Sequence, residues 1–323
     1  MDKRLLYVYN PNAGKGLIVP KLHEVVDMFI KDGFRVEIYP TQGTKDAIRV
    51  VEENASQYDI VACSGGDGTL DEVVTGMIRS GAKKPIGYIP VGTTNDYASS
   101  LNISKDVKLA AHEIVLGTPH FLDVGRFNQD YFVYIAAFGI FTEVSYATDQ
   151  NFKKLFGHMA YLLEGIKSLT DIKSYNLKVD IDGEVYEGDF IYGMVTNSQS
   201  VGGFKHLTGK NVELDDGLFE VTLIKMPKNV LEMTEIITSL LAQEDKTDLI
   251  ISCKAKKVKV MSESPVSWTR DGEFGGEYTE VLLENMQHAM SILLVDEAGM
   301  DETVAKIQDK KLTVASETDV KKM

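Results

Sequence analysis

Hydrophobic positions in the first third of the chain alternate between two periods. Short continuous apolar runs, typical of strands buried on both faces, occur at 5–9, 34–39, 60–63 and 86–89. Between these runs, apolar residues recur every three or four positions, as on one face of a helix, and these stripes span 22–30, 47–55 and 70–78. The alternation predicts an α/β domain over residues 1–125, with a parallel sheet and helices on both of its faces.

The pattern changes after residue 125. Two extended runs, 175–181 and 185–192, are joined by Asp182-Gly183, a strong signal for a two-residue hairpin turn. Further extended runs follow at 218–224, 256–260, 266–269, 279–284 and 290–295, and helical stripes interrupt the strands at 159–169 and 233–241. We therefore expect a second, β-rich and mostly antiparallel domain over residues 126–295. A polar tail with at most one short helix follows over 296–323.

Composition narrows the classes of function. The 323 residues include 34 Lys and Arg against 48 Asp and Glu, which gives a formal net charge of −14. This charge repels a polyphosphate backbone, so the sequence predicts no nucleic-acid partner. A spanning helix needs about 20 apolar residues, and no run reaches that length. We expect a cytoplasmic protein whose contact with a membrane is peripheral.

The strongest local motif is the segment 64–69, Ser-Gly-Gly-Asp-Gly-Thr, which follows a predicted strand and precedes a predicted helix. Its three glycines let the backbone approach a phosphate closely, and the helix N-terminus adds N–H groups and the positive end of its dipole. A carboxylate such as Asp67 beside a phosphate needs a divalent cation between them. A tight turn with a helix-capping Asp is the alternative interpretation.

Two further polar turns follow predicted strands and are therefore expected at the same edge of the sheet. They are 10–16, Asn-Pro-Asn-Ala-Gly-Lys-Gly, and 90–96, Pro-Val-Gly-Thr-Thr-Asn-Asp. Either turn alone is more often structural, and the hydroxyl, amide and carboxyl side chains at 93–96 are also typical helix caps. Three such turns at one edge together favour a phosphate site, and hence a Rossmann-like nucleotide domain.

The order of these motifs resembles the diacylglycerol kinase catalytic family, which includes bacterial lipid kinases and the sphingosine and ceramide kinases. The matching segments are 10–14, 65–69, 92–96, Asp-Val-Gly at 123–125, Gly-Gly-Phe at 202–204, Leu-Asp-Asp-Gly-Leu at 214–218 and Asp-Gly-Glu at 271–273. NAD kinases share the Gly-Gly-Asp-Gly-Thr motif, whereas the segments 92–96 and 271–273 favour lipid kinases. The resemblance implies ATP and Mg²⁺ as cofactors and a lipid alcohol as substrate.

The resemblance also implies a role for individual residues. Those implied to contact ATP are Asn10, Pro11, Asn12, Ala13, Gly14, Thr41, Gly66, Asp67, Gly68, Thr69, Leu70, Asp71, Glu72, Thr93 and Thr94. The carboxylates of Asp67, Asp96 and Asp123 are implied to form, with water, the network around a catalytic Mg²⁺. The carboxylate of Glu273 is implied to be the general base for the lipid hydroxyl.

The turn 214–218 is similar to a structural Mg²⁺ site of the bacterial enzymes. Its implied ligands are the carboxylate of Asp216 and the backbone carbonyls of Glu213 and Leu218, with Asp215 as an alternative to Asp216. From the sequence alone, a plain turn is almost as good an interpretation, because backbone ligands leave no signature in a sequence.

Asp271 is a further catalytic candidate. It lies two positions before Glu273, so on an extended strand the two carboxylates would share one face. The alternative is a hairpin turn at Asp271-Gly272, since Asp-Gly is the commonest hairpin signal.

The sequence thus predicts an ATP-dependent lipid kinase, with diacylglycerol and phosphatidic acid as the preferred substrate and product. It would act at the inner face of the cell membrane, and a homodimer remains open. NAD kinase is an alternative enzyme and predicts a second nucleotide pocket. A non-catalytic nucleotide sensor of the same fold is the other alternative and predicts ATP binding without turnover.

Overall fold

A computed structural model describes residues 3–140, 172–201, 204–205, 212–242 and 247–295. The helix predicted at 159–169 and the tail predicted over 296–323 lie outside these ranges. The chain divides into two compact units, and each is described by itself. Among the described residues, the first comprises those in 3–92, 101–120 and 291–295, and the second comprises those in 93–100 and 121–290.

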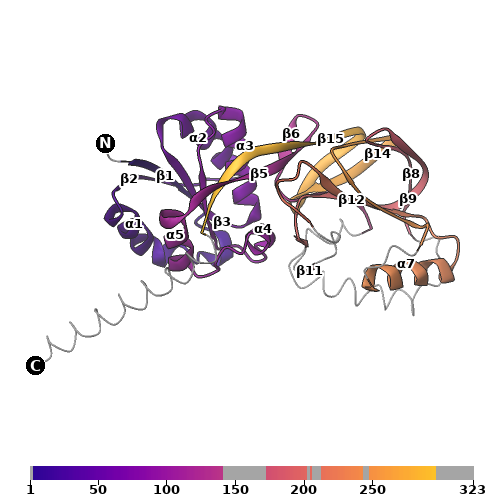
Figure 1. The fold of residues 1–323 in the computed structure, drawn as a ribbon, viewed down its shortest axis with the longest axis horizontal. Helices are drawn as coiled ribbons and strands as arrows, with labels where there is room; N and C mark the ends of the chain where they lie inside the picture. The colour runs from indigo at the N-terminus through magenta and orange to yellow at the C-terminus, as the bar shows by residue number, and fades with distance from the viewer. Residues whose placement is uncertain (1–2, 141–171, 202–203, 206–211, 243–246, 296–323) are drawn as a thin grey trace, which may run out of the picture. The chain divides into compact units, whose positions relative to one another are not determined.

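Parallel strands form the centre of the first unit (Figure 1). In sheet order they are β2 (Phe34–Pro40), β1 (Lys3–Tyr9), β3 (Ile60–Gly65) and β4 (Ile86–Pro90). The end of β15 (Glu273–Leu294) runs parallel to β4 and pairs Ile292 with Ile86. All six residues of β3 are buried, as its unbroken apolar run predicts for a strand with both faces covered.

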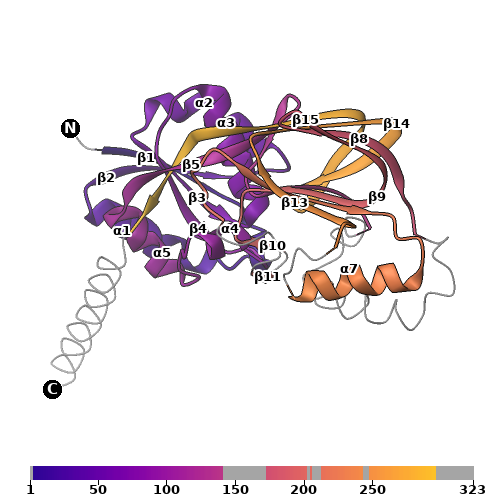
Figure 2. The same ribbon diagram turned by 45° about the vertical axis from the view of Figure 1, so that its right-hand side comes forward.

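Helices cover both faces of this parallel sheet (Figure 2). One pair is α2 (Asp46–Asn54) with α3 (Asp67–Ser80), and the other is α1 (Leu22–Lys31) with α5 (Val107–Leu116). The first pair packs closely because Gly76 has no side chain: a Cβ there would lie 2.6 Å from the carbonyl oxygen of Ile48. The predicted stripes match α1, α2 and α3, whereas α5 was not predicted.

The second unit is mostly antiparallel. Its strands follow the order β13 (Ile250–Ala255), β12 (Phe219–Lys225), β9 (Glu184–Thr196), β7 (Ile135–Gly139), β14 (Lys257–Arg270) and β15. β8 (Tyr175–Ile181) pairs with β9 and β14, and β5 (Thr118–Phe127) pairs with β15 and with β6 (Asp130–Phe132). Short elements complete it: α4 (Asp96–Ser100), α7 (Val230–Ala242), β10 (Ser200–Val201) and β11 (Phe204–Lys205). The architecture is therefore mixed α/β with many antiparallel strands.

Aromatic residues dominate the core of the second unit. Trp268 is 1% exposed, with its ring centroid 4.9 Å from that of Phe138 and 5.3 Å from that of Phe127, both in edge-on geometry. Such pairs add to the burial of apolar area, so this cluster fixes how the strands pack.

The predicted hairpin at Asp182-Gly183 is confirmed. Both residues have positive φ, 49° and 95°, and Ile181 pairs with Glu184 across the two-residue turn. A two-residue turn of this kind requires positive φ at both positions, which Asp and Gly tolerate.

Four predicted strands prove to be parts of two long ones. The runs 256–260 and 266–269 both lie in β14, whose register with β15 shifts between Met261 and Val266. The runs 279–284 and 290–295 both lie in β15. In β14 the register shift absorbs the polar segment between the two runs without ending the strand.

The domain boundary predicted at residue 125 also does not coincide with the limits of the two units. Residues 93–100 and 121–125 lie in the second unit, and 291–295 lie in the first. The reason is that β15 leaves the second unit after residue 290 and supplies the edge of the parallel sheet.

Candidate active site

In the first unit, backbone hydrogen bonds join the loops that follow the parallel strands. The N–H of Asn10, after β1, donates to the carbonyl of Ser64 at 2.9 Å. The N–H of Thr41, after β2, donates to the carbonyl of Tyr9 at 2.9 Å. The N–H of Val91, after β4, donates to the carbonyl of Gly65 at 2.9 Å. The predicted turns therefore meet at the carboxyl ends of the strands, where open α/β sheets bind ligands.

Glycines make this close approach feasible. Gly14 has φ +54°, and a Cβ there would lie 1.9 Å from the carbonyl oxygen of Val91. A Cβ on Gly66 would lie 3.3 Å from the Cα of Gly92. Hence the loops after β1, β3 and β4 touch backbone to backbone, and only glycine fits at residue 14.

Asp67 is the first residue of α3, directly after the N-cap residue Gly66. The carbonyl of Gly66 accepts the N–H groups of Thr69 and Leu70 at 3.0 and 3.2 Å. The half-buried carboxylate thus lies where the helix dipole favours negative charge. Burial raises the pKa of Tyr88 well above its usual range, and the negative charge of Asp67 raises it further.

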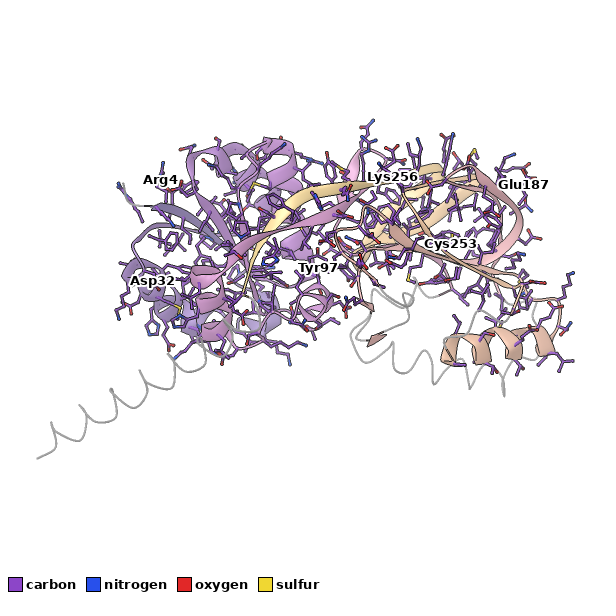
Figure 3. All side chains as sticks on the ribbon, viewed as in Figure 1. Arg4, Asp32, Tyr97, Glu187, Cys253 and Lys256 are labelled. Carbon is purple, nitrogen blue, oxygen red and sulfur yellow. The ribbon has the colours of Figure 1, made fainter. Side chains whose placement is uncertain are left out.

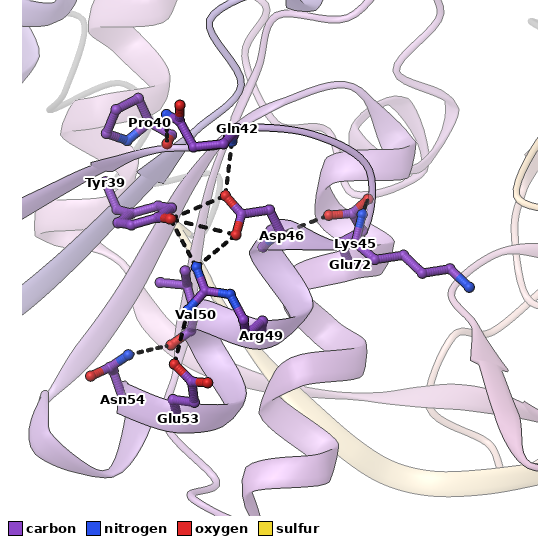
Figure 4. Close-up of polar contacts among 11 residues, drawn as sticks. Tyr39, Pro40, Gln42, Lys45, Asp46, Arg49, Val50, Glu53, Asn54 and Glu72 are labelled. Carbon is purple, nitrogen blue, oxygen red and sulfur yellow. Dashed lines mark hydrogen bonds and ion pairs between the residues drawn. The ribbon is translucent and has the colours of Figure 1, made fainter.

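Two carboxylates hold the loop after β2 (Figure 4). Asp46 accepts the N–H of Gln42 at 2.8 Å. Glu72 accepts the N–H of Lys45 at 2.6 Å through one oxygen and the N–H of Ala47 at 3.2 Å through the other. Glu72, a predicted ATP contact, therefore binds the last residue of the loop that carries Thr41 with one oxygen and the first turn of α2 with the other.

Burial separates the predicted ATP-binding residues into three groups. Asn12 and Thr93 are exposed; Asn10, Pro11, Ala13, Gly14, Thr41, Gly66, Asp67, Gly68, Asp71, Glu72 and Thr94 are half-buried; Thr69 and Leu70 are buried. Leu70 is 0% exposed, so its side chain belongs to the core. Thr93 and Thr94 lie in the second unit and the others in the first.

In the second unit, Asp123 is 0% exposed and lies at the centre of a backbone network. One carboxylate oxygen accepts the N–H of Gly217 at 2.7 Å, and the other accepts the N–H of His288 at 2.9 Å. Its own N–H donates to the carbonyl of Leu214 at 2.9 Å. The structure thereby connects Asp123 directly to the turn 214–218.

Asp271 occupies a hairpin turn, so the expectation that it shares a strand face with Glu273 is wrong. Asp271 and Gly272 have φ values of 46° and 83°, and Arg270 pairs with Glu273 across the turn. Asp271 is 5% exposed and accepts three N–H bonds, from Val133 at 2.6 Å, Tyr134 at 3.0 Å and Ile135 at 2.9 Å. Glu273, in contrast, is exposed at the start of β15.

Tyr97 is a residue of this region that the sequence did not single out (Figure 3). It is 0% exposed in α4 and directly follows Asp96, which is 3% exposed. Burial raises the pKa of Tyr97 well above its usual range, and the negative charges of Asp271 and Asp123 raise it further. Tyr97 therefore lies within electrostatic reach of two predicted carboxylates, Asp123 and Asp271, and its position beside Asp96 was the only signal for it.

Asp216 is bound through both of its oxygens, one within the turn 214–218 and one by β13. One accepts the N–H of Leu218 at 2.9 Å, and the other accepts the ammonium of Lys254 at 2.6 Å. Asp215 and Glu213 are exposed. Glu220, on β12, is 5% exposed with one oxygen 3.6 Å from the same ammonium. Burial raises the pKa of Glu220 to about 7, against the lowering effect of Lys254.

The described ranges lack two further features. They contain no group of three or more His, Cys, Asp and Glu side chains arranged to hold a metal ion. None of the helices in them is long and apolar enough to cross a membrane.

Comparison with known proteins covers both units. The diacylglycerol kinase catalytic domain family matches residues 4–127. The YegS C-terminal NAD kinase beta sandwich-like domain family matches residues 135–293. A catalytic kinase domain joined to this second domain defines an enzyme, a lipid kinase.

Individual relatives carry the same family name as the first domain. The diacylglycerol kinase of Bacillus subtilis (strain 168) is 34% identical over 277 residues, 85% of this chain and 91% of the relative. That of Staphylococcus carnosus (strain TM300) is 34% identical over 293 residues, 89% of this chain and 94% of the relative. The chain belongs to the diacylglycerol kinase family.

A solved structure supports the fold. The crystal structure of a diacylglycerol kinase from Bacillus anthracis str. Sterne superposes with a TM-score of 0.71, covering 92% of this chain and 98% of its own. At 23% identity, this likeness concerns the fold alone.

Proposed function

We propose that the chain transfers the γ-phosphate of ATP to the hydroxyl of diacylglycerol, giving phosphatidic acid and ADP. The first unit would serve as a Rossmann-like nucleotide domain and the second as the lipid domain. The observation that carries the proposal is the meeting of the loops after β1, β2, β3 and β4 at one edge of a parallel sheet. The substrate class is supported by the relatives named diacylglycerol kinase.

The loops of the first unit are suited to bind phosphates. Gly14 and Gly66 remove the side chains that would block a close approach, and the N-terminus of α3 offers N–H groups. The loop after β2, held by Asp46 and Glu72, presents Thr41 to the same edge. Phosphoryl transfer depends mainly on such positioning and on neutralisation of charge.

Glu273 would act as the general base. Its exposed carboxylate accepts the proton of the lipid hydroxyl as that oxygen forms a bond to the γ-phosphorus and the bond to the bridging oxygen of ADP breaks. Asp271 holds the hairpin turn beside it through three N–H bonds. Asp271 therefore supports Glu273 as a positioning residue.

Carboxylate oxygens are the donors that Mg²⁺ prefers, and Asp67 places one at the N-terminus of α3. Asp67 would hold the catalytic ion, which neutralises phosphate charge when bound. Asp123 would be a positioning residue and no direct ligand, because its two oxygens accept the N–H groups of Gly217 and His288. Asp216, with the carbonyls of Glu213 and Leu218, would hold the structural ion. Asp216 is preferred over Asp215 because its carboxylate already binds the backbone of its own turn.

The substrate sets the place of action. Diacylglycerol resides in a membrane, so the enzyme would work in the cytoplasm at the inner face of the cell membrane. A homodimer is part of the same proposal, and size-exclusion chromatography with light scattering would test it.

A transfer assay with a substrate panel tests the proposal. The protein is incubated with labelled ATP, Mg²⁺ and mixed micelles containing diacylglycerol, a sphingoid base or a polyprenol, with NAD as a separate substrate. We expect label in phosphatidic acid. Label in NAD and in none of the lipids would instead favour an NAD kinase, and ATP binding without any transfer would favour a sensor.

A further inference from the structure

Glu220 is a buried carboxylate that none of the family motifs includes. It lies on β12, between Phe219 and Val221, which are 0% exposed and belong to the core. Glu220 itself is 5% exposed, and neither of its oxygens accepts a hydrogen bond from the residues that the structure describes. A buried carboxylate without such bonds is costly, so its presence needs an explanation.

Lys254 compensates this charge only in part. It lies opposite Glu220 on β13, and its ammonium nitrogen is 2.6 Å from Asp216 but 3.6 Å from Glu220. The shorter contact is a charge-assisted hydrogen bond, whereas the longer one is only a loose ion pair. Two carboxyl groups therefore face one ammonium, and Asp216 takes its short hydrogen bond.

A divalent cation matches this arrangement better than an ammonium does. Two carboxylates balance a charge of +2, and an ion with oxygen ligands at 2.0–2.6 Å accepts several oxygens at once. Lys254 has a side chain that is 33% exposed, so its head group has a way out to solvent. The cluster can therefore exchange one cation for another.

We propose that Glu220 and Asp216 together bind a divalent cation at the position that the Lys254 ammonium takes in this structure. Lys254 moves to solvent when the ion binds and competes with it when the ion is scarce. This inference rests on the magnesium site proposed for the turn 214–218, and it adds a ligand from β12 and a competing cation from β13.

Two substitutions with opposite expected effects test the inference. Mg²⁺ affinity is measured by titration calorimetry without ATP, and the gain in Tm with Mg²⁺ is measured alongside. Glu220→Gln removes a ligand charge and should weaken Mg²⁺ binding by roughly ten- to a hundredfold. Lys254→Gln removes the competitor, so it should lower the Tm without Mg²⁺ and strengthen Mg²⁺ binding.

A surface pair provides the matched control. Glu187, on β9 (Figure 3), and Lys178, on β8, form an exposed ion pair at 2.6 Å. Glu187→Gln and Lys178→Gln make the same changes of charge in the same unit and should leave Mg²⁺ binding as in the parent. If they shift it as much as the cluster variants do, the effect is one of general charge and the inference fails.

The outcomes separate this inference from the proposed function. If Asp216→Asn abolishes Mg²⁺ binding while Glu220→Gln and Lys254→Gln bind as the parent does, the site in the turn stands and the inference falls. If the parent itself binds no Mg²⁺ without ATP, both fall, while lipid phosphorylation is judged by the transfer assay. If Glu220→Gln does not fold, Lys254→Gln decides alone: weaker or unchanged binding overturns the inference.

Discussion

The two units use their motif residues in opposite ways. In the first unit, the loops at the strand ends touch through backbone atoms, and Gly14 and Gly66 keep side chains out of the contact. In the second unit, Asp123 and Asp271 fill the interior, and backbone N–H groups bind both oxygens of each. In the first unit the loops meet through backbone atoms, whereas in the second unit backbone N–H groups bind buried carboxylates. A motif match therefore does not distinguish a residue that binds from one that builds the site.

The largest effect is expected at Glu273, where the second unit would act on the substrate. Glu273→Gln keeps the size of the side chain but removes the proton acceptor, so kcat should fall by about 10²–10⁴. The Tm and the KM for ATP should stay close to those of the parent, because the side chain is exposed. Steady-state kinetics in mixed micelles check this. Glu277→Gln, exposed on the same strand, is the control, and equal activity of the two variants would remove Glu273 as the base.

The second largest effect is expected at Asp271, where substitution should lower the stability of the second unit. Asp271→Asn turns an amide NH₂ toward backbone N–H groups that the carboxylate accepts, so the free energy of unfolding should fall by about 2–3 kcal/mol. Asp182→Asn is the matched control. Asp182 holds the same place in an Asp-Gly hairpin turn and also binds two N–H groups, at 2.8 and 2.9 Å, but it is exposed. Urea denaturation should show a loss of less than about 1 kcal/mol there, and similar losses at both sites would contradict a special role for burial.

Substitution of Gly14 tests whether the loop after β1 in the first unit takes part in nucleotide binding. Gly14→Ala introduces a Cβ against the Val91 carbonyl, so the loops must separate and the KM for ATP should rise roughly tenfold, the equivalent of about one hydrogen bond. Gly33→Ala separates this steric effect from backbone strain, because Gly33 also has positive φ, +86°, but a Cβ there meets nothing within 4 Å. That variant should lose about 1 kcal/mol of stability and keep its KM for ATP. A normal KM in Gly14→Ala would remove this loop from the nucleotide site.

The smallest effect concerns acid stability of the loop after β2. Burial disfavours the charged form of Asp46, but the Gln42 N–H and the Arg49 guanidinium outweigh it and hold the pKa of Asp46 below its usual range. A depressed pKa contributes stability that is present above the unfolded pKa, about 3.9, and is lost as the pH falls through the folded value. Asp46→Asn should therefore cost about 1 kcal/mol at neutral pH, and the difference from the parent should shrink in acid. A difference that is constant with pH, measured by urea denaturation, would contradict this.

Local patterns predicted the first unit well because each of its elements carries its own period. The stripe at 70–78 and the run at 60–63 correspond to α3 and β3. The second unit was predicted less well because its strands are longer than its apolar runs. β15 extends over 22 residues, and its burial alternates irregularly between the two predicted runs. The length of such a strand depends on its pairing register with neighbouring strands. That register cannot be read from the strand's own residues alone.

The residues of the candidate site were also predicted only in part. The sequence pointed to Asp123, Asp216 and Asp271, which the structure places in or beside backbone networks. It gave no sign of Glu220 or Lys254, because one glutamate and one lysine on separate strands look like ordinary surface residues. They become a cluster only when β12 and β13 pair and bring them opposite each other.

The final residues of β15 affect how the protein is made. Ribosomes make Ile86 of β4 long before Ile292 of β15, yet the two residues pair in neighbouring strands of the same sheet. A nascent chain that ends after residue 127 therefore exposes an unpaired edge on β4, and such edges recruit strands from other chains. The N-terminal kinase domain therefore gains the strand beside β4 only after residue 292 has been made. Expression of that domain alone would thus be prone to aggregation, unless a peptide spanning 286–295 is supplied in trans.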